Sequence, residues 1–217
     1  ASRFNVASLS ANLGLAKMAY RRDPAAALED FEGAMQIIRE LLSLPRSVGE
    51  GNGEVSSEDL AALGDEVRSM IGSLHYIQGD PAAAAPLFHE ALAARRLAAA
   101  ASPSDREAKR ALARSIKAVG ETDFLLGDRA QGFALYEECL AIQRDLAEPA
   151  DGDRDILEDL INLPITEGDY GDLCIRTGDL TNAAVHYDAS VAALQALAEQ
   201  DATNADVVHE LGLALYR

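Results

Sequence analysis

The strongest constraint on the fold of this chain is a short stretch that ends one helix and begins another. In residues 71–92, IGSLHYIQGDPAAAAPLFHEAL, an apolar periodic run stops at Gly79. A glycine there can adopt the left-handed conformation that closes a helix at little steric cost. Asp80 can accept backbone N–H groups of the next turn, and Pro81 suits the first helical position because no N–H donor is needed there. The stretch therefore predicts a helical hairpin.

The same corner recurs along the chain. The corner aspartates, Asp23, Asp80, Asp128 and Asp179, are 57, 48 and 51 residues apart. An aromatic residue follows each aspartate eight positions later: Phe31, Phe88, Tyr136 and Tyr187. Small residues follow four and eleven positions later: Ala27, Ala84, Gly132 and Ala183, then Ala34, Ala91, Cys139 and Ser190. A glycine precedes the last three aspartates by eight positions: Gly72, Gly120 and Gly171, with Gly14 one position out of step in the first copy.

The glycines in register indicate a packing requirement, because a glycine inside a helix costs about 1 kcal/mol relative to alanine. We expect the two helices of each hairpin to cross at these small residues. We expect the aromatic residue to fill the wedge between one hairpin and the next.

These residues resemble the tetratricopeptide repeat (TPR), which has apolar-Gly in its first helix, Gly-Asp at the corner, and Ala, Tyr/Phe and Ala in its second helix. The resemblance covers essentially the whole chain. The period is near 50 residues rather than the usual 34 or so, and the proline expected after the second helix is missing. The resemblance implies an all-α fold, a right-handed α-solenoid of antiparallel helical hairpins. Long-period arrays of this kind accompany signalling and effector domains in bacterial multidomain proteins.

The pattern predicts a single array over residues 1–217. Its units are expected at about 4–44, 57–101, 104–147 and 153–200, with a terminal helix at 204–217. Pro45 and the glycines of residues 45–56 predict a loop. Pro164, inside the first helix of the fourth unit, predicts a kink or a break. The chain begins without Met and stops inside a repeat, so we expect a piece of a longer protein or a processed one.

The charge excludes some classes of partner. The chain has 36 acidic and 19 basic residues, a net charge of −17, which disfavours nucleic acid and anionic membrane surfaces and is compatible with a basic partner. No signal peptide is visible, and no apolar run approaches the roughly 18 residues of a membrane span.

Cys139 and Cys174 stand where the repeat expects buried residues, which indicates reduced core thiols in a cytoplasmic protein, with a disulfide as the alternative.

The candidate chemical motifs are incomplete. The glycines of residues 49–53 lack the preceding strand and the Lys-Ser/Thr of a phosphate-binding loop. Residues 151–155 have the aspartate spacing of a calcium loop, but Ile156 and Asn162 stand where Gly and Glu are required. The four histidines lack a second ligand at helical spacing. We therefore expect no catalytic residue, metal site or cofactor, and a protein that is not an enzyme.

The resemblance also implies a binding surface, because TPR ligands contact mainly the first helix of each unit. Aligned on the glycines, these concave-face positions are Glu66, Ser69, Ser73 and Tyr76; Arg114, Lys117, Glu121 and Phe124; and Asp169, Asp172, Ile175 and Arg176. They lack the Lys/Asn pattern with which chaperone-binding TPRs hold a terminal carboxylate. We expect a basic edge, an acidic edge and an aromatic floor, with Phe124 or Tyr76 receiving an apolar anchor of the ligand. The alternative is that these side chains form an ordinary solvated face.

The expected function is non-catalytic binding of a protein or peptide, as a scaffold or regulatory module. The alternative is a structural, oligomerisation or spacer array attached to a separate signalling or effector domain. Self-association is compatible with the apolar residues of the terminal helix, namely Leu211, Leu215 and Tyr216.

Overall fold

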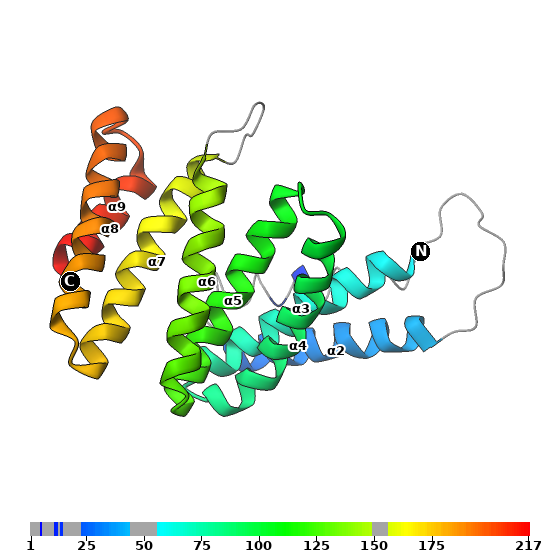
Figure 1. Ribbon diagram of the computed structural model, residues 1–217. Helices are drawn as coiled ribbons and strands as arrows, with labels where there is room; N and C mark the ends of the chain where they lie inside the picture. Colours follow the sequence, from blue (N-terminus) through cyan, green and yellow to red (C-terminus); the bar gives the residue numbers. More distant parts are fainter. Residues whose placement is uncertain (1–4, 6–10, 13, 15–22, 44–55, 149–155) are drawn as a thin grey trace. The chain divides into compact units, whose positions relative to one another are not determined.

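The regular secondary structure is entirely helical in the part of the chain that the structure describes. The computed structural model describes residues 5, 11–12, 14, 23–43, 56–148 and 156–217. The helices are α2 (Pro24–Ser43), α3 (Ser57–Ile77), α4 (Pro81–Ala101), α5 (Arg106–Leu126), α6 (Arg129–Ala147), α7 (Ile156–Thr177), α8 (Leu180–Gln200) and α9 (Ala205–Tyr216) (Figure 1). The predicted all-α fold class is confirmed. Most of the predicted first helix and of the loop at 45–56 lies outside the described residues.

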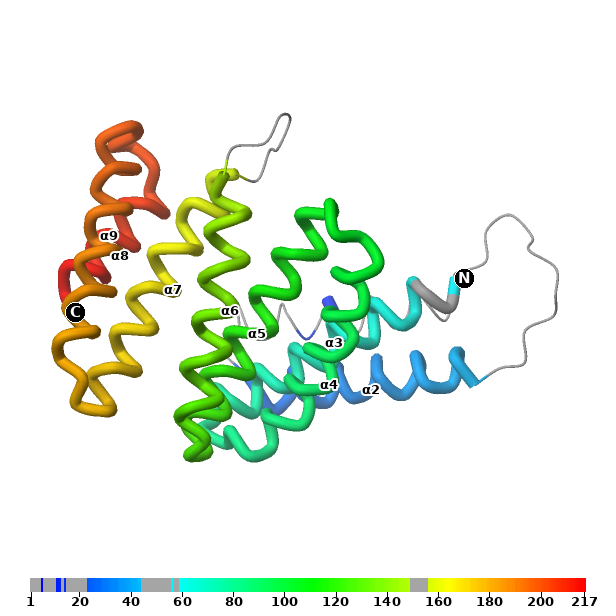
Figure 2. The backbone as a smooth tube through the Cα atoms, viewed as in Figure 1, coloured from blue at the N-terminus to red at the C-terminus, as the bar shows by residue number. Residues whose placement is uncertain are grey.

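Two compact units make up the chain, residues 1–94 and 95–217. In the first unit, α2 packs against α3 around Phe31, Ile38, Val67 and Leu74. In the second unit, α5 pairs with α6 and α7 pairs with α8, while α6 also contacts α7 and α9 contacts both α7 and α8. Figure 2 shows α5 to α9 running alternately in opposite directions through this unit. The second unit is therefore a stack of helical hairpins in chain order.

The predicted corners have the expected geometry. Gly79, Gly127 and Gly178 have φ values of 80°, 105° and 81°, the left-handed conformation that glycine adopts without a Cβ clash. The aspartate after each glycine accepts the backbone N–H of the third residue beyond it, over 2.9 Å at Asp80, 3.2 Å at Asp128 and 3.1 Å at Asp179. Each corner thus ends one helix and caps the next.

The repeated glycines are contact points for the repeated aromatics. A Cβ atom placed on Gly72 would lie 2.7 Å from Phe88 Cε1, and one placed on Gly171 would lie 2.6 Å from Tyr187 Cε1. The aromatic ring therefore packs onto the glycine of its own hairpin, which the wedge prediction did not anticipate. Between hairpins, the ring of Tyr136 also meets that of Tyr170 edge to face, with centroids 6.1 Å apart.

Of the kink or break predicted at Pro164, the break is wrong. Helix α7 continues from Ile156 to Thr177 with Pro164 inside it, and α4 likewise contains Pro86. A proline removes one backbone hydrogen bond and crowds the preceding turn. Pro164 is buried where α7 packs between α6 and α8, so this packing holds the helix together around it.

Candidate partner-binding face

Charged side chains from three helices meet on one side of the second unit. Lys117 of α5 lies 2.5 Å (Nζ to Oδ2) from Asp169 of α7. Arg217, at the end of α9, lies 2.6 Å (Nη2 to Oδ1) from the same carboxylate. We call Arg114, Lys117, Asp169, Asp172 and Arg217 the first-helix face, because α5, α7 and α9 occupy the first-helix positions of successive hairpins. The structure thus brings together two of the stripes that the sequence placed on separate helices.

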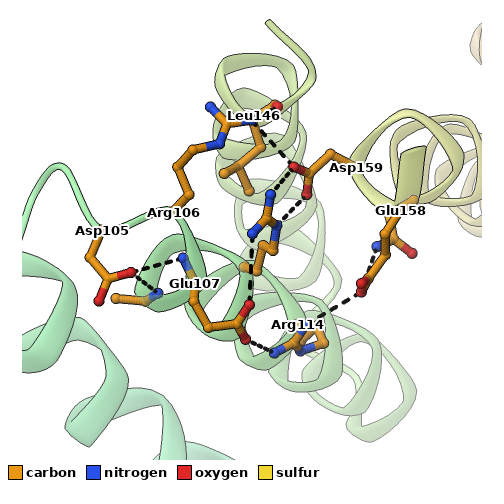
Figure 3. Close-up of polar contacts among 10 residues, drawn as sticks. Asp105, Arg106, Glu107, Arg114, Leu146, Glu158 and Asp159 are labelled. Atoms are coloured by element: carbon orange, nitrogen blue, oxygen red, sulfur yellow. Dashed lines mark hydrogen bonds and ion pairs between the residues drawn. The ribbon is translucent and has the colours of Figure 1, made fainter. Parts of the chain in front are cut away.

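Arg114 is the most exposed cation of this face. Its side chain is 52% exposed, and its guanidinium lies 2.9 Å from Glu107 Oε1 and 3.6 Å from Glu158 Oε1 (Figure 3). Ion pairs at such exposed positions contribute only about 0–1 kcal/mol. A partner carboxylate can therefore replace Glu107 or Glu158 at little cost.

Asp172 is oriented by a tyrosine of the following helix. The hydroxyl of Tyr187 donates a hydrogen bond of 2.7 Å to Asp172 Oδ1. Burial, together with this bond to the carboxylate, raises the pKa of Tyr187 to about 12. Tyr187 therefore stays protonated at neutral pH and keeps the carboxylate in a fixed orientation.

The aromatic floor predicted at Phe124 is wrong. Phe124 is only 5% exposed, and its ring packs edge to face against Phe133 of α6, with centroids 5.6 Å apart. The side chain belongs to the core between α5 and α6, so it is not available to anchor a ligand.

The remaining predicted residues lie at various places. Ile175 and Arg176 are exposed near the end of α7, and Glu121 is half-buried on α5. The others belong to α3 of the first unit, where Glu66 is exposed and Ser69, Ser73 and Tyr76 are half-buried. The hydroxyl of Ser73 donates to the backbone carbonyl of Ser69 over 2.9 Å. These four residues are not part of the face defined on the second unit.

A buried ion pair beneath this side of the unit was missed by the sequence analysis. Arg110 of α5 is 6% exposed and Asp159 of α7 is 3% exposed. They are joined by two hydrogen bonds, 2.9 Å from Nε to Oδ1 and 2.6 Å from Nη2 to Oδ2. Arg106 bonds to the same carboxylate over 3.3 Å and to the carbonyl oxygen of Leu146 (Figure 3). The pair ties the start of α7 to α5 and to the end of α6.

A second polar cluster joins α6, α7 and α8. Glu167 of α7 lies 2.8 Å from the guanidinium of Arg144 and 2.6 Å from Nδ1 of His186. The imidazole of His186 stacks on Tyr170, with ring centroids 4.0 Å apart. Burial and the neighbouring Glu137 carboxylate raise the pKa of Tyr170 to about 12. These contacts fix the orientation of α7, which supplies both aspartates of the first-helix face.

The chemistry available on this face is ionic and hydrogen-bonding recognition. Among the described residues, no group of three or more His, Cys, Asp or Glu side chains could hold a metal ion. Cys139 and Cys174 are buried free thiols, and burial raises the pKa of Cys139 to about 12. A thiol with a raised pKa is a poor nucleophile at neutral pH.

Within the residues that the structure describes, no helix has the length and hydropathy of a membrane span.

The repeat pattern also has a counterpart among known families. A family model described as tetratricopeptide repeat matches residues 66–99, which span the end of α3, the Gly-Asp corner and most of α4. The chain contains a tetratricopeptide repeat. The match begins inside α3, which starts at Ser57, so the residues by which this unit exceeds an ordinary TPR include the beginning of its first helix. Tetratricopeptide repeats generally serve as scaffolds for protein interaction, and stacked repeats provide extended binding surfaces.

Solved structures give the fold but no closer relationship. BtubC (BKLC) from P. vanneervenii is similar with a TM-score of 0.64 and 18% identity, over 88% of this chain and 64% of that one. The chain thus spans less than two thirds of that protein's length, and the likeness shows the fold alone. MamA aligns at a TM-score of 0.38 and 12% identity, over 87% of this chain and 88% of MamA, which is too low to carry an argument. A comparison with curated proteins found no match.

Proposed function

We propose that this chain is a non-catalytic scaffold that binds a protein or peptide segment through the first-helix face. The observation that carries the proposal is the contact of Lys117 with Asp169, 2.5 Å from Nζ to Oδ2. This contact brings the first helices of successive hairpins within reach of one extended ligand. Tetratricopeptide repeats act as interaction scaffolds in general. The matched repeat lies at residues 66–99, and the proposal extends its role to the later hairpins, which have the same Gly-Asp corner at residues 127–128 and 178–179.

The charges of the face indicate a ligand that carries both signs. Arg114 and Lys117 provide cations from α5, while Asp169 and Asp172 provide carboxylates from α7. The net charge of −17 favours the approach of a ligand with a basic excess, and this attraction weakens as salt increases. Exposed Ile175, close to Asp172 in sequence on α7, offers apolar contact in place of the buried Phe124.

A charge reversal on α5 should show whether peptide binding depends on this face or on another part of the protein. We suggest selecting displayed random peptides on the full chain and measuring the Kd of one selected peptide for the wild type and for Lys117→Glu. We expect Lys117→Glu to weaken binding of the peptide about tenfold or more. The substitution removes a cation that would contact the peptide, and it places the new carboxylate opposite that of Asp169.

The matched control is Lys109→Glu. Lys109 lies on the same helix and also pairs with an aspartate, but its partner is Asp145 of α6, at 2.5 Å. Lys109→Glu should leave the Kd of the selected peptide nearly unchanged. Equal effects of the two substitutions, or none from Lys117→Glu in a chain that circular dichroism shows to be folded, would exclude this face as the site.

A second candidate function, self-association, is favoured by the surface of α9. Its exposed large apolar residues are Val208, Leu213, Leu215 and Tyr216. If this surface mediates assembly, the mass measured by sedimentation should rise with protein concentration and Leu215→Lys should abolish the rise. A mass that is independent of concentration would reject this alternative and leave the peptide-binding proposal in place.

A further inference from the structure

A glycine on α7 leaves a slot that a guanidinium group fills. A Cβ atom placed on Gly168 would collide with Nη1 of Arg217, and Cζ of the same guanidinium lies 3.1 Å from that position, so the end of the guanidinium enters the space beside the glycine. The same Cβ position is 3.5 Å from Ser190 Oγ of α8. An alanine at position 168 would therefore occupy the space that Arg217 now uses.

Two carboxylates face this slot, and each is held in place by the protein. Asp169 directs Oδ1 at Arg217 Nη2 over 2.6 Å, while Lys117 holds its Oδ2 at 2.5 Å. Asp172 directs Oδ2 at Arg217 Nη2 over 3.4 Å, while the Tyr187 hydroxyl donates to its Oδ1 at 2.7 Å. Each aspartate therefore has one oxygen fixed by a neighbour and the other facing the guanidinium, as a preorganised site requires.

The floor of the slot has a polar group without a partner. Ser190 is 1% exposed, and its Oγ has no hydrogen-bond partner among the residues that the structure describes. A buried hydroxyl in this state is unfavourable, so it is rare in folded proteins. Its Oγ borders the same Cβ position of Gly168 as Nη1 of Arg217 but accepts no hydrogen bond from it, so this acceptor is left for an N–H group of a bound ligand.

We infer that the slot formed by Gly168, Asp169, Asp172, Tyr187 and Ser190 recognises an arginine side chain of a bound peptide, and that Arg217 occupies it in the free chain. The inference rests on the proposed function, because it names the side chain through which the first-helix face selects its ligand. A guanidinium presents several donors in a fixed fork, so it can place one nitrogen, Nη1, beside the glycine while a second nitrogen, Nη2, faces both carboxylates. A lysine ammonium carries all of its donors on one nitrogen, so it cannot reach the glycine and the two carboxylates from two separate nitrogens.

Arg217 then acts as an internal competitor. The side chain is 27% exposed and reaches the slot from the end of α9, so an incoming arginine has to displace it. While a group of the same chain occupies the slot, an external ligand can bind only the chains whose slot is free. The apparent affinity is therefore the intrinsic affinity multiplied by the free fraction.

The experiment uses the full chain with Arg217→Ala and, as probe, the peptide acetyl-Gly-Arg-Gly-amide. Binding is measured by NMR chemical-shift titration of the α7 amides. We expect Arg217→Ala to bind the probe about tenfold more tightly than the wild type, because the competitor is gone. The lysine analogue of the probe should bind about tenfold more weakly than the arginine probe.

Filling the slot provides the decisive variant. Gly168→Ala in the Arg217→Ala background should abolish binding, and no backbone atom obstructs the new Cβ, so the fold should be retained. The matched control is Gly33→Ala in the same background, since Gly33 has nothing within 4 Å of an added Cβ. Equal binding of the two probes, no gain from Arg217→Ala, or no loss from Gly168→Ala would each overturn the inference.

The two proposals fail in different ways. A library-selected peptide whose Kd depends on Lys117 but not on Gly168→Ala would reject the slot and keep the first-helix face. Probe binding that Gly168→Ala abolishes, with no selected peptide that responds to Lys117→Glu, would keep the slot and reject the wider function.

Discussion

Replacing Asp159 by alanine should lower the free energy of unfolding by about 3–5 kcal/mol. Arg110, 6% exposed, would lose both of its hydrogen bonds to the buried Asp159, while the exposed Glu107 carboxylate, 3.8 Å from its Nη1, would compensate the buried charge only partly. Arg106 would lose the same acceptor. The loss should appear in urea unfolding of the full chain followed by circular dichroism, and as faster amide exchange in α7.

A double replacement distinguishes the charge from the volume. Arg110→Met with Asp159→Leu removes both charges and should recover much of the stability, because apolar residues of similar size often replace a buried ion pair without loss. The matched control is Asp145→Ala, whose aspartate pairs with Lys109 on the surface and should cost at most about 1 kcal/mol. If Asp159→Ala and Asp145→Ala have equal effects, the buried pair is not what fixes α7 to α5.

The corners could be predicted because their chemistry is local. Gly79 and Asp80 are adjacent, and the left-handed φ of the glycine and the capping bond of the aspartate depend only on neighbouring residues. The repeated spacing then placed the small residues at the helix crossings, whereas the aromatic residues were expected between hairpins and were found on the glycines of their own hairpins. By contrast, Arg110 and Asp159 are 49 residues apart, and nothing local relates them.

Phe124 was misplaced although the sequence held the information to place it. It follows Gly120 by four positions, so the two residues share a face of the helix. Gly120 was assigned to the hairpin crossing, which puts Phe124 against α6 as well, where its ring is found. The error at Pro164 has a different source. Pro164 was expected to kink or split the helix unless its surroundings adapted, and α7 stays unbroken where it is packed against α6 and α8.

The slot at Gly168 could not have been found from the repeat pattern. Gly168 is outside the set of repeated glycines, and its partner Arg217 is 49 positions away, directly after α9. Asp169 and Asp172 were predicted as site residues. Their orientation depends on Lys117 and Tyr187, which each hold one oxygen of a carboxylate so that the other faces the guanidinium. Such an arrangement becomes visible only when α5, α7, α8 and the residue after α9 are placed together.

Gly132→Ala should destabilise the second unit by about 1–3 kcal/mol, although alanine favours helix over glycine by about 1 kcal/mol. A Cβ on Gly132 would lie 2.8 Å from the carbonyl oxygen of Gly120 and 2.7 Å from Phe124 Cβ. These atoms belong to the backbone of α5 or attach directly to it, so relief requires the two helices to move apart. That movement would also loosen the core around Phe124 and Tyr136.

The control for Gly132→Ala is Gly33→Ala, which has the same chemistry without the contact. Gly33 lies inside α2 with nothing within 4 Å of an added Cβ, so the substitution should stabilise the first unit by up to about 1 kcal/mol. Urea midpoints should thus move in opposite directions for two identical replacements. If both rise, the crossing of α5 and α6 tolerates a methyl group, and close backbone approach is not the reason for a small residue four positions after Asp128.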